Sequence, residues 1–376
     1  MSKTTMRVYL IPGFFGFVNL GELAYFSHVK KFLKERLKEK GASAVVHTVH
    51  TAPTASIRTR TERLLKTIEA TAKNEKDPIV LVGHSTGGLD ARLLVTPEVS
   101  LAGDLNAEPV AERVRSIVTV NTPHYGTPLA AFFSSLLGAQ LLKLFSIVTV
   151  YIIRFGRLPL SLFLKIGALM ARLDNHAGFD KSIVDQIFEQ LLGDFSKDRS
   201  EAVKEFLEDL SDDQSLFTQL DPEGIDLFNA AAADRTSVRY GCVVTAADKP
   251  SLKTVSSVGL DPYAQASHGL FTTLHTICAM SAAKFRGELT ERQRDKISAS
   301  LGTLPDDTLN DGIIPSLSHV WGEVIHVARG DHLDVIGHFN AAEHDPPHYD
   351  WLVCGAPFYR GEFESLWQSV ADFIKP

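Results

Sequence analysis

A serine at the junction between an apolar run and a helix-like segment constrains the fold more than any other feature of this chain. Residues 79–82 are apolar, and residues 83–87 read Gly-His-Ser-Thr-Gly, which together fit the pattern of a strand, Gly-x-Ser-x-Gly and a helix. In this pattern the serine lies on a tight turn where strand and helix pass too close for side chains. Gly83 and Gly87 are therefore predicted to permit the turn, and Ser85 is predicted to be a nucleophile.

Apolar runs that suit β-strands alternate along the chain with amphipathic segments that suit helices. The first such elements are predicted at residues 8–11, 24–39, 44–49, 55–73, 79–82 and 114–120. Later strands are predicted at residues 238–245 and 323–327, and a closing helix at residues 363–374. Alternating strands and helices form parallel sheets that are covered on both faces. The pattern therefore predicts an α/β fold with a mostly parallel central sheet flanked by helices.

A strongly apolar segment, residues 128–173, interrupts this alternation. Lys143 divides its uncharged part, and neither piece reaches the ~18 to 20 residues that a membrane span needs. We therefore interpret the segment as apolar helices of a lid, followed by an acidic outer part. The predicted organisation is a core formed by residues 1–130 and 216–376, with a helical lid or cap at residues 131–215.

A serine hydroxyl needs a base to accept its proton, and a histidine base needs a carboxylate to orient it. In folds with this turn the chain order is serine, acid, histidine. Among the fourteen histidines, His332 follows the predicted strand 323–327 directly and is the best candidate base. His84 is expected to pack behind the turn. The remaining late histidines are interpreted as surface or supporting groups: His319, His338, His344 and His348.

The best candidate acid is Asp311, in a turn about twenty residues before His332. Its neighbours form the sequence Asn-Asp-Gly, which also occurs in turns that have only a structural role. Asp248, just after the predicted strand 238–245, is the main rival. The order of residues along the chain leaves both carboxylates open.

Two backbone N–H groups are needed to bind the oxyanion that forms when an ester is attacked. One is expected from Thr86, directly after the nucleophile, and the other from the loop after the first strand. That loop reads Pro-Gly-Phe-Phe-Gly at residues 12–16 and places Phe14 in the donor position. An ordinary glycine-rich turn is the alternative interpretation of this loop.

Net charge, cysteine content and the first residues of the chain indicate which partners and which cellular compartment to expect. The net charge of −7 at pH 7 gives no reason to expect nucleic acid as a partner. The three cysteines, Cys242, Cys278 and Cys354, lack metal-ligand spacing and are expected to be free thiols. We expect no cofactor and no catalytic metal. The first residues pass directly into a predicted strand without the features of a signal peptide, which predicts a cytoplasmic protein.

Several stretches resemble bacterial lipases and carboxylesterases of the α/β-hydrolase superfamily, which include triacylglycerol lipases. The similar stretches are residues 11–14, 25–26, 56–60, 83–92, 121–128, 220–229, 310–312 and 332–334. The resemblance implies the α/β-hydrolase fold and favours Asp311 as the acid and His332 as the base. Proline at position 12 departs from the histidine of many relatives. In some relatives the aspartate matching Asp334 binds a structural calcium, but His338 here replaces an expected oxygen ligand.

These features together predict a serine hydrolase of carboxylic esters. Its expected substrates are small esters or lipids with hydrophobic acyl chains, because apolar lid helices cover an apolar pocket. Basic residues among those helices also suggest contact with a lipid surface. An acyltransferase or polyester depolymerase with the same three residues is the alternative, and a binding protein without catalytic activity is a further one.

Overall fold

The computed structural model describes residues 4–14, 25–103, 105–134, 181–197, 215–280, 287–341, 343, 348–350 and 352–375, with isolated residues between 144 and 213. A six-stranded parallel sheet forms the centre, in the order β2-β1-β3-β4-β5-β6. Its strands are β1 (Met6–Ile11), β2 (Ala44–Thr48), β3 (Ile79–His84), β4 (Val114–Val120), β5 (Arg239–Ala246) and β6 (Glu323–Arg329). The prediction of a mostly parallel sheet is confirmed.

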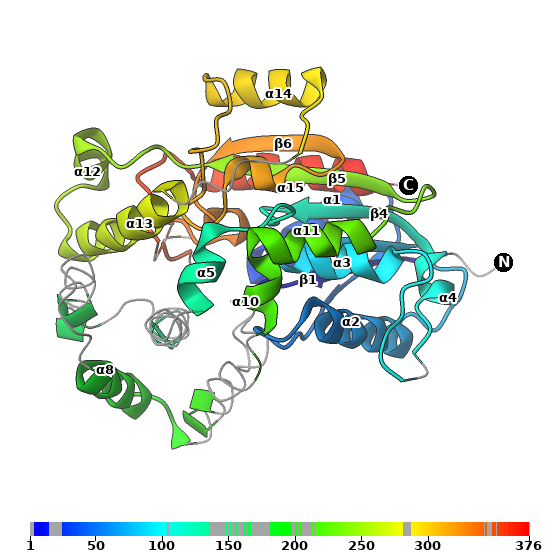
Figure 1. The fold of residues 1–376 in the computed structure, drawn as a ribbon, viewed down its shortest axis with the longest axis horizontal. Helices are drawn as coiled ribbons and strands as arrows, with labels where there is room; N and C mark the ends of the chain where they lie inside the picture. The colour runs from blue at the N-terminus through cyan, green and yellow to red at the C-terminus, as the bar shows by residue number, and fades with distance from the viewer. Residues whose placement is uncertain are drawn as a thin grey trace.

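Helices cover both faces of this sheet (Figure 1). Val8 and Leu10 of β1 belong to the apolar cluster that includes α1 (Ser27–Glu39) and α15 (Arg360–Ile374). Tyr9 and Ile11 belong instead to the cluster that includes α2 (Ile57–Thr71) and α3 (Gly87–Val95). Because side chains alternate along a strand, an apolar run without polar interruptions requires burial on both faces. This requirement is met here.

The remaining helices lie around the sheet and the helices that cover it (Figure 1). They are α4 (Glu108–Ala111), α5 (Pro128–Ser134), α8 (Lys181–Gly193), α10 (Ser215–Leu220), α11 (Pro222–Ala231), α12 (Leu252–Val258), α13 (Pro262–Met280) and α14 (Glu291–Leu301). Two short 3₁₀ helices, η1 (Ser316–His319) and η2 (Asp334–Ile336), flank β6. α5 packs against α10 and α13, and α14 packs on β6. The sequence patterns did not predict α12, α13 and α14.

Most of the predicted lid lies outside the described residues, so the division at residues 131–215 stays a prediction. Within that segment α8 is helical, and the hydroxyl of Tyr151 donates to Asp194 Oδ2 at 2.6 Å. Among the described residues, none of the helices combines the length and the apolar character needed to cross a membrane.

The register of the strands brings loops that are distant in sequence together at the edge formed by the carboxyl ends of the strands. Ile11 pairs with Gly83 between β1 and β3, and His84 pairs with Val120 between β3 and β4. The strand predicted to end at residue 327 continues to Arg329. Because parallel strands share a direction, the segments after β1, β3 and β6 all leave the sheet at this edge. These are the segments that contain Phe14, Ser85 and His332.

Candidate active site

Ser85 occupies a strained turn between β3 and α3. Its φ angle is 53°, a left-handed conformation that side-chain-bearing residues rarely adopt. A Cβ at Gly83 would lie 2.4 Å from the carbonyl carbon of Gly87, and a Cβ at Gly87 would lie 2.3 Å from the carbonyl oxygen of Ile11. Both positions therefore require glycine, and the turn presents Ser85 at the end of the sheet.

Asp311 and His332 lie in hydrogen-bonding contact, although twenty-one positions separate them in the chain. His332 Nδ1 is 2.6 Å from Asp311 Oδ2, and the backbone N–H of His332 donates to the carbonyl oxygen of Asp311 at 3.0 Å. Asp311 Oδ1 accepts the N–H groups of Ile313 and Ile314 at 2.9 and 2.7 Å. This set of contacts holds the imidazole with Nδ1 toward the carboxylate.

The pKa of the Asp311 carboxyl is well below its ordinary value. Burial alone would raise it, but the charge of His332, the hydrogen bond with His332 and the close contact with His319 outweigh burial and lower it. Asp311 is therefore an anion at neutral pH, as the orientation of a histidine base requires.

His319 is a second imidazole beside Asp311. Its Nε2 lies 3.3 Å from Asp311 Oδ2, and its Nδ1 accepts the backbone N–H of Thr245 at 3.4 Å. The accepted bond leaves the proton of the neutral ring on Nε2, facing the carboxylate. The sequence placed His319 only among supporting groups, because nothing in its local pattern marks contact with an acid.

The rival carboxylate and the other late histidines lie elsewhere. Asp248 pairs with Arg329, and its side chain is 42% exposed. His338 is half-buried, and its ring contacts the backbone of Tyr349. His348 stacks on His28, with ring centroids 3.6 Å apart. His344 lies outside the described residues. Of the two candidate acids, the structure therefore brings Asp311 into contact with His332.

An apolar cavity opens beside Ser85 and His332. Phe14 and Thr86, the two predicted oxyanion donors, also line it. The rest of its wall comes from α5, α10 and two loops, and consists of Pro123, Thr127, Leu129, Ala130, Phe133, Phe217, Leu220, Ile313 and Ile314. The candidate nucleophile, base and oxyanion donors thus share one cavity with an aliphatic and aromatic wall.

The loop after β1 lies directly against Ser85. A Cβ at Gly13 would lie 2.4 Å from Ser85 Cβ, so glycine permits this close approach. Arg60, in α2, anchors the loop by donating from Nη2 to the carbonyl oxygen of Pro12 at 2.8 Å. Arg60 is held in turn by Asp90 of α3, at 2.8 Å between Nη2 and Oδ2. Phe15 and Gly16 lie outside the described residues.

His84 connects this loop with the loop that carries His332. The Nε2–H of His84 donates to the carbonyl oxygen of His332 at 2.9 Å, so Nδ1 accepts from the hydroxyl of Tyr25 at 2.5 Å. The backbone N–H of Gly13 bonds to the same hydroxyl. Burial, with the nearby charge of His332, lowers the pKa of His84 well below its ordinary value, so the ring is neutral. The ring of His84 therefore links Tyr25 with the backbone of His332.

Replacing Asp90 with alanine is expected to lower the free energy of unfolding by about 3–5 kcal/mol, because it leaves the buried Arg60 guanidinium without its partner. Both side chains are fully buried. Urea titration measures the change. Glu39→Ala is the control, because Glu39 pairs with Arg36 at the surface and should cost no more than about 1 kcal/mol. Equal effects of the two substitutions would contradict the prediction.

The calcium site implied by the resemblance does not fit the residues present. The side chains gathered around Asp334 are Asp331 and Cys354, and His338 is not among them. Calcium prefers six to eight oxygen ligands, and a thiol is a poor ligand for so hard a cation. We therefore assign no calcium to this loop and derive no catalytic step from a metal.

The chain is similar to known proteins in part of its sequence and over most of its fold. The family model described as "PGAP1-like alpha/beta domain" matches residues 26–145. A comparison of the sequence with curated proteins finds no match.

Three solved structures share the fold over almost the whole chain. EstA from Clostridium botulinum has a TM-score of 0.53 at 18% identity and aligns over 98% of this chain and 87% of its own. Lipase 1 from Pelosinus fermentans has a TM-score of 0.52 at 15% identity, over 98% and 99%. The Staphylococcus hyicus lipase has a TM-score of 0.52 at 16% identity, over 98% and 95%. With its parallel sheet and the turn at Ser85, this chain has the α/β-hydrolase fold.

Proposed function

We propose that the protein is a serine hydrolase of carboxylic esters with hydrophobic acyl chains. One observation carries the proposal. Ser85, on its strained turn, lines the same apolar cavity as His332, and Asp311 lies 2.6 Å from the far nitrogen of that histidine. Such a pairing activates a hydroxyl for attack on an acyl carbon. The two lipases of similar fold agree with this reaction class.

The proposed reaction has two halves. Ser85 Oγ bonds to the acyl carbon while His332 Nε2 takes its proton, and His332 then gives that proton to the alcohol as the ester bond breaks. Water attacks the acyl-enzyme in the same way, its proton passing through His332 back to Ser85 Oγ. Asp311 keeps the other imidazole proton on Nδ1. The backbone N–H groups of Phe14 and Thr86 bind the oxyanion in both halves.

The proposal is tested first by covalent labelling. A fluorophosphonate probe should label the protein at Ser85, because the probe reacts with serines whose proton a base accepts. Mass spectrometry of the digested protein locates the modified residue. Labelling of a different serine, or none, would contradict the proposed nucleophile, while hydrolysis of an aryl ester by the same preparation establishes the reaction.

The apolar wall of the cavity predicts which esters are preferred. Each buried methylene contributes ~0.8 kcal/mol, so burial of two additional methylenes raises kcat/KM by about tenfold. p-Nitrophenyl octanoate should therefore be hydrolysed with a kcat/KM at least about tenfold above that of the acetate. Ala130→Leu, which narrows the cavity, should reduce the octanoate rate and spare the acetate rate. A strict preference for acetate would contradict the assignment of this cavity to the acyl chain.

A further inference from the structure

Three buried side chains with metal-binding atoms converge behind the loop that carries His332. They are Asp331, Asp334 and Cys354, and one ligand atom from each lies within 4.8 Å of the others. Cys354 Sγ is 3.7 Å from Asp334 Oδ2. In a tetrahedral site with Zn–S of 2.3 Å and Zn–O of 2.0 Å, sulfur and oxygen are about 3.5 Å apart. The spacing of these atoms therefore suits a small cation between them.

One oxygen of this group is buried without a hydrogen-bond partner among the described residues. Asp331 Oδ1 accepts the backbone N–H groups of Leu333 and Asp334, at 2.8 and 3.1 Å, whereas Asp331 Oδ2 accepts none. A buried, unsatisfied carboxylate oxygen is costly and requires an explanation. Gly330 packs closely against the group, since a Cβ at that position would lie 2.9 Å from Asp334 Oδ2. The unsatisfied oxygen of Asp331 points to a ligand at this place.

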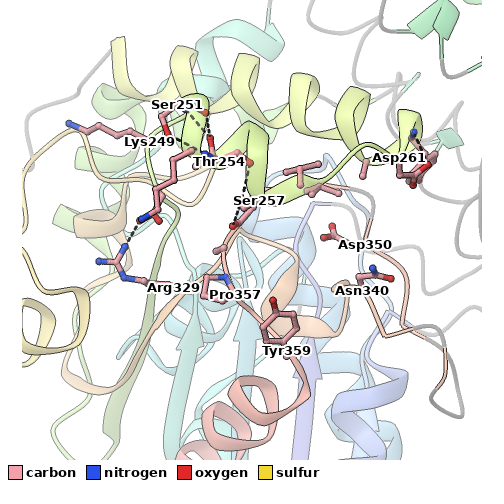
Figure 2. A pocket seen from close by; sticks show the side chains of 18 of the residues that line it. Lys249, Ser251, Thr254, Ser257, Asp261, Arg329, Asn340, Asp350, Pro357 and Tyr359 are labelled. Carbon is pink, nitrogen blue, oxygen red and sulfur yellow. Dashed lines mark hydrogen bonds and ion pairs between the residues drawn. The ribbon is translucent and has the colours of Figure 1, made fainter.

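A pocket that contains a further carboxylate lies beside the segment that carries Cys354. Asp350 lines a pocket of about 920 Å³ between α12, the end of β6 and the segment 349–359 (Figure 2). Val353 and Gly355, the neighbours of Cys354 in the chain, line the same pocket, so the pocket lies beside the segment that carries the thiol.

We propose that Asp331, Asp334 and Cys354 bind a thiophilic divalent cation of the zinc type. A thiolate with carboxylates is a ligand set that zinc accepts, whereas calcium and magnesium select oxygen alone. Binding forms a sulfur–metal bond and releases the proton of the Cys354 thiol to solvent. The site supports the loop that holds His332 in place and takes no part in the reaction, so it does not depend on the proposed ester hydrolysis.

The proposed site lies on both sides of His332 in the chain, and this position predicts an effect on the stability of the loop. Asp331 directly precedes His332, and Asp334 follows it by two residues. Asp331 already accepts two N–H groups of the turn between them, so a cation bound to both carboxylates would close the turn with a further link. We therefore expect the bound cation to raise the unfolding temperature of the protein, because it binds the folded state alone.

Metal titration of the full chain after removal of metals with a chelator tests the proposal. Zn²⁺ should bind with a stoichiometry of one and raise Tm, whereas the same concentration of Ca²⁺ or Mg²⁺ should leave Tm unchanged. Co²⁺ in place of zinc should give the near-ultraviolet absorption of a thiolate–cobalt bond. Cys354→Ser should remove that absorption and weaken zinc binding by more than ~100-fold, which is the upper end for loss of an outer-sphere partner.

Matched variants keep the test decisive even if one substitution harms folding. Cys242→Ser and Cys278→Ser remove other buried thiols and should retain the cobalt absorption. Asp331→Asn should weaken zinc binding while retaining all three thiols. Ser85→Ala should bind zinc like the parent, so failure of the proposed hydrolase and failure of this site are distinguishable. Protection by Ca²⁺ equal to that by Zn²⁺, or cobalt binding without a thiolate signal in the parent, would overturn the proposal.

Discussion

Replacement of Ser85 by alanine is expected to lower kcat for p-nitrophenyl esters by about 10⁶-fold. The hydroxyl is the atom that bonds to the acyl carbon in the proposed reaction, and no other side chain can take its place on the turn. The positive φ of residue 85 is unchanged by alanine, which bears a Cβ as serine does. KM should change little, because the hydroxyl contributes to the transition state more than to binding of the ester.

Ser116→Ala is the matched control for this variant. Ser116 is a buried serine in β4, the strand next to β3, and does not line the cavity. Its replacement should leave both the rate and the fluorophosphonate labelling within about twofold of the parent, because it touches no reacting atom. If Ser85→Ala kept the parent rate while retaining its circular dichroism spectrum, Ser85 would not be the nucleophile.

Replacement of Asp311 by asparagine is expected to lower kcat by about 10⁴-fold. The asparagine oxygen would accept the N–H groups of Ile313 and Ile314, as Oδ1 does now, which turns the amide NH₂ toward His332 Nδ1. The imidazole must then accept at Nδ1 and carry its proton on Nε2. In that tautomer Nε2 has no lone pair with which to accept the proton of Ser85.

Asp248→Asn is the control for this second variant. Asp248 is the rival candidate acid from the sequence, but in the structure it pairs with Arg329 at the surface. Its replacement should change kcat by less than about twofold, since exposed ion pairs contribute at most about 1 kcal/mol to stability and this one touches no reacting atom. A large loss in Asp248→Asn together with a small loss in Asp311→Asn would reverse the assignment of the acid.

The fold followed from local patterns wherever the pattern was strong. The apolar runs that predicted β1, β3 and β4 could only be strands buried on both faces, since each is followed by a turn or by glycine. α13 was missed because its nineteen residues mix apolar, polar and histidine positions without a clear amphipathic period. α12 and α14 are short and largely exposed, so their sequences carry little periodic signal.

The residues of the candidate site also fall into those that the sequence predicted and those that it missed. Ser85 was predicted as the nucleophile from its neighbours alone, because the turn needs glycine at defined spacing. His332 was chosen by its place in the chain order, whereas that order left Asp311 and Asp248 both open. The family resemblance favoured Asp311, and only the structure showed which of the two contacts His332. Arg60, Tyr25 and His319 were not assigned contacts with the site. Their contacts are with loops far away in sequence, and a single chain without its fold carries no signal of such contacts.

The sequence by itself determined the sheet, the strained turn at Ser85 and the small set of acids and histidines available to it. These depend on hydrophobic period and on steric demands between near neighbours, which act over a few residues. Only the tertiary structure decided which acid meets His332, which arginine holds Pro12 and which thiol joins Asp331 and Asp334. Each of these depends on parallel strands bringing loops from opposite ends of the chain to one edge of the sheet, where burial makes every polar contact specific.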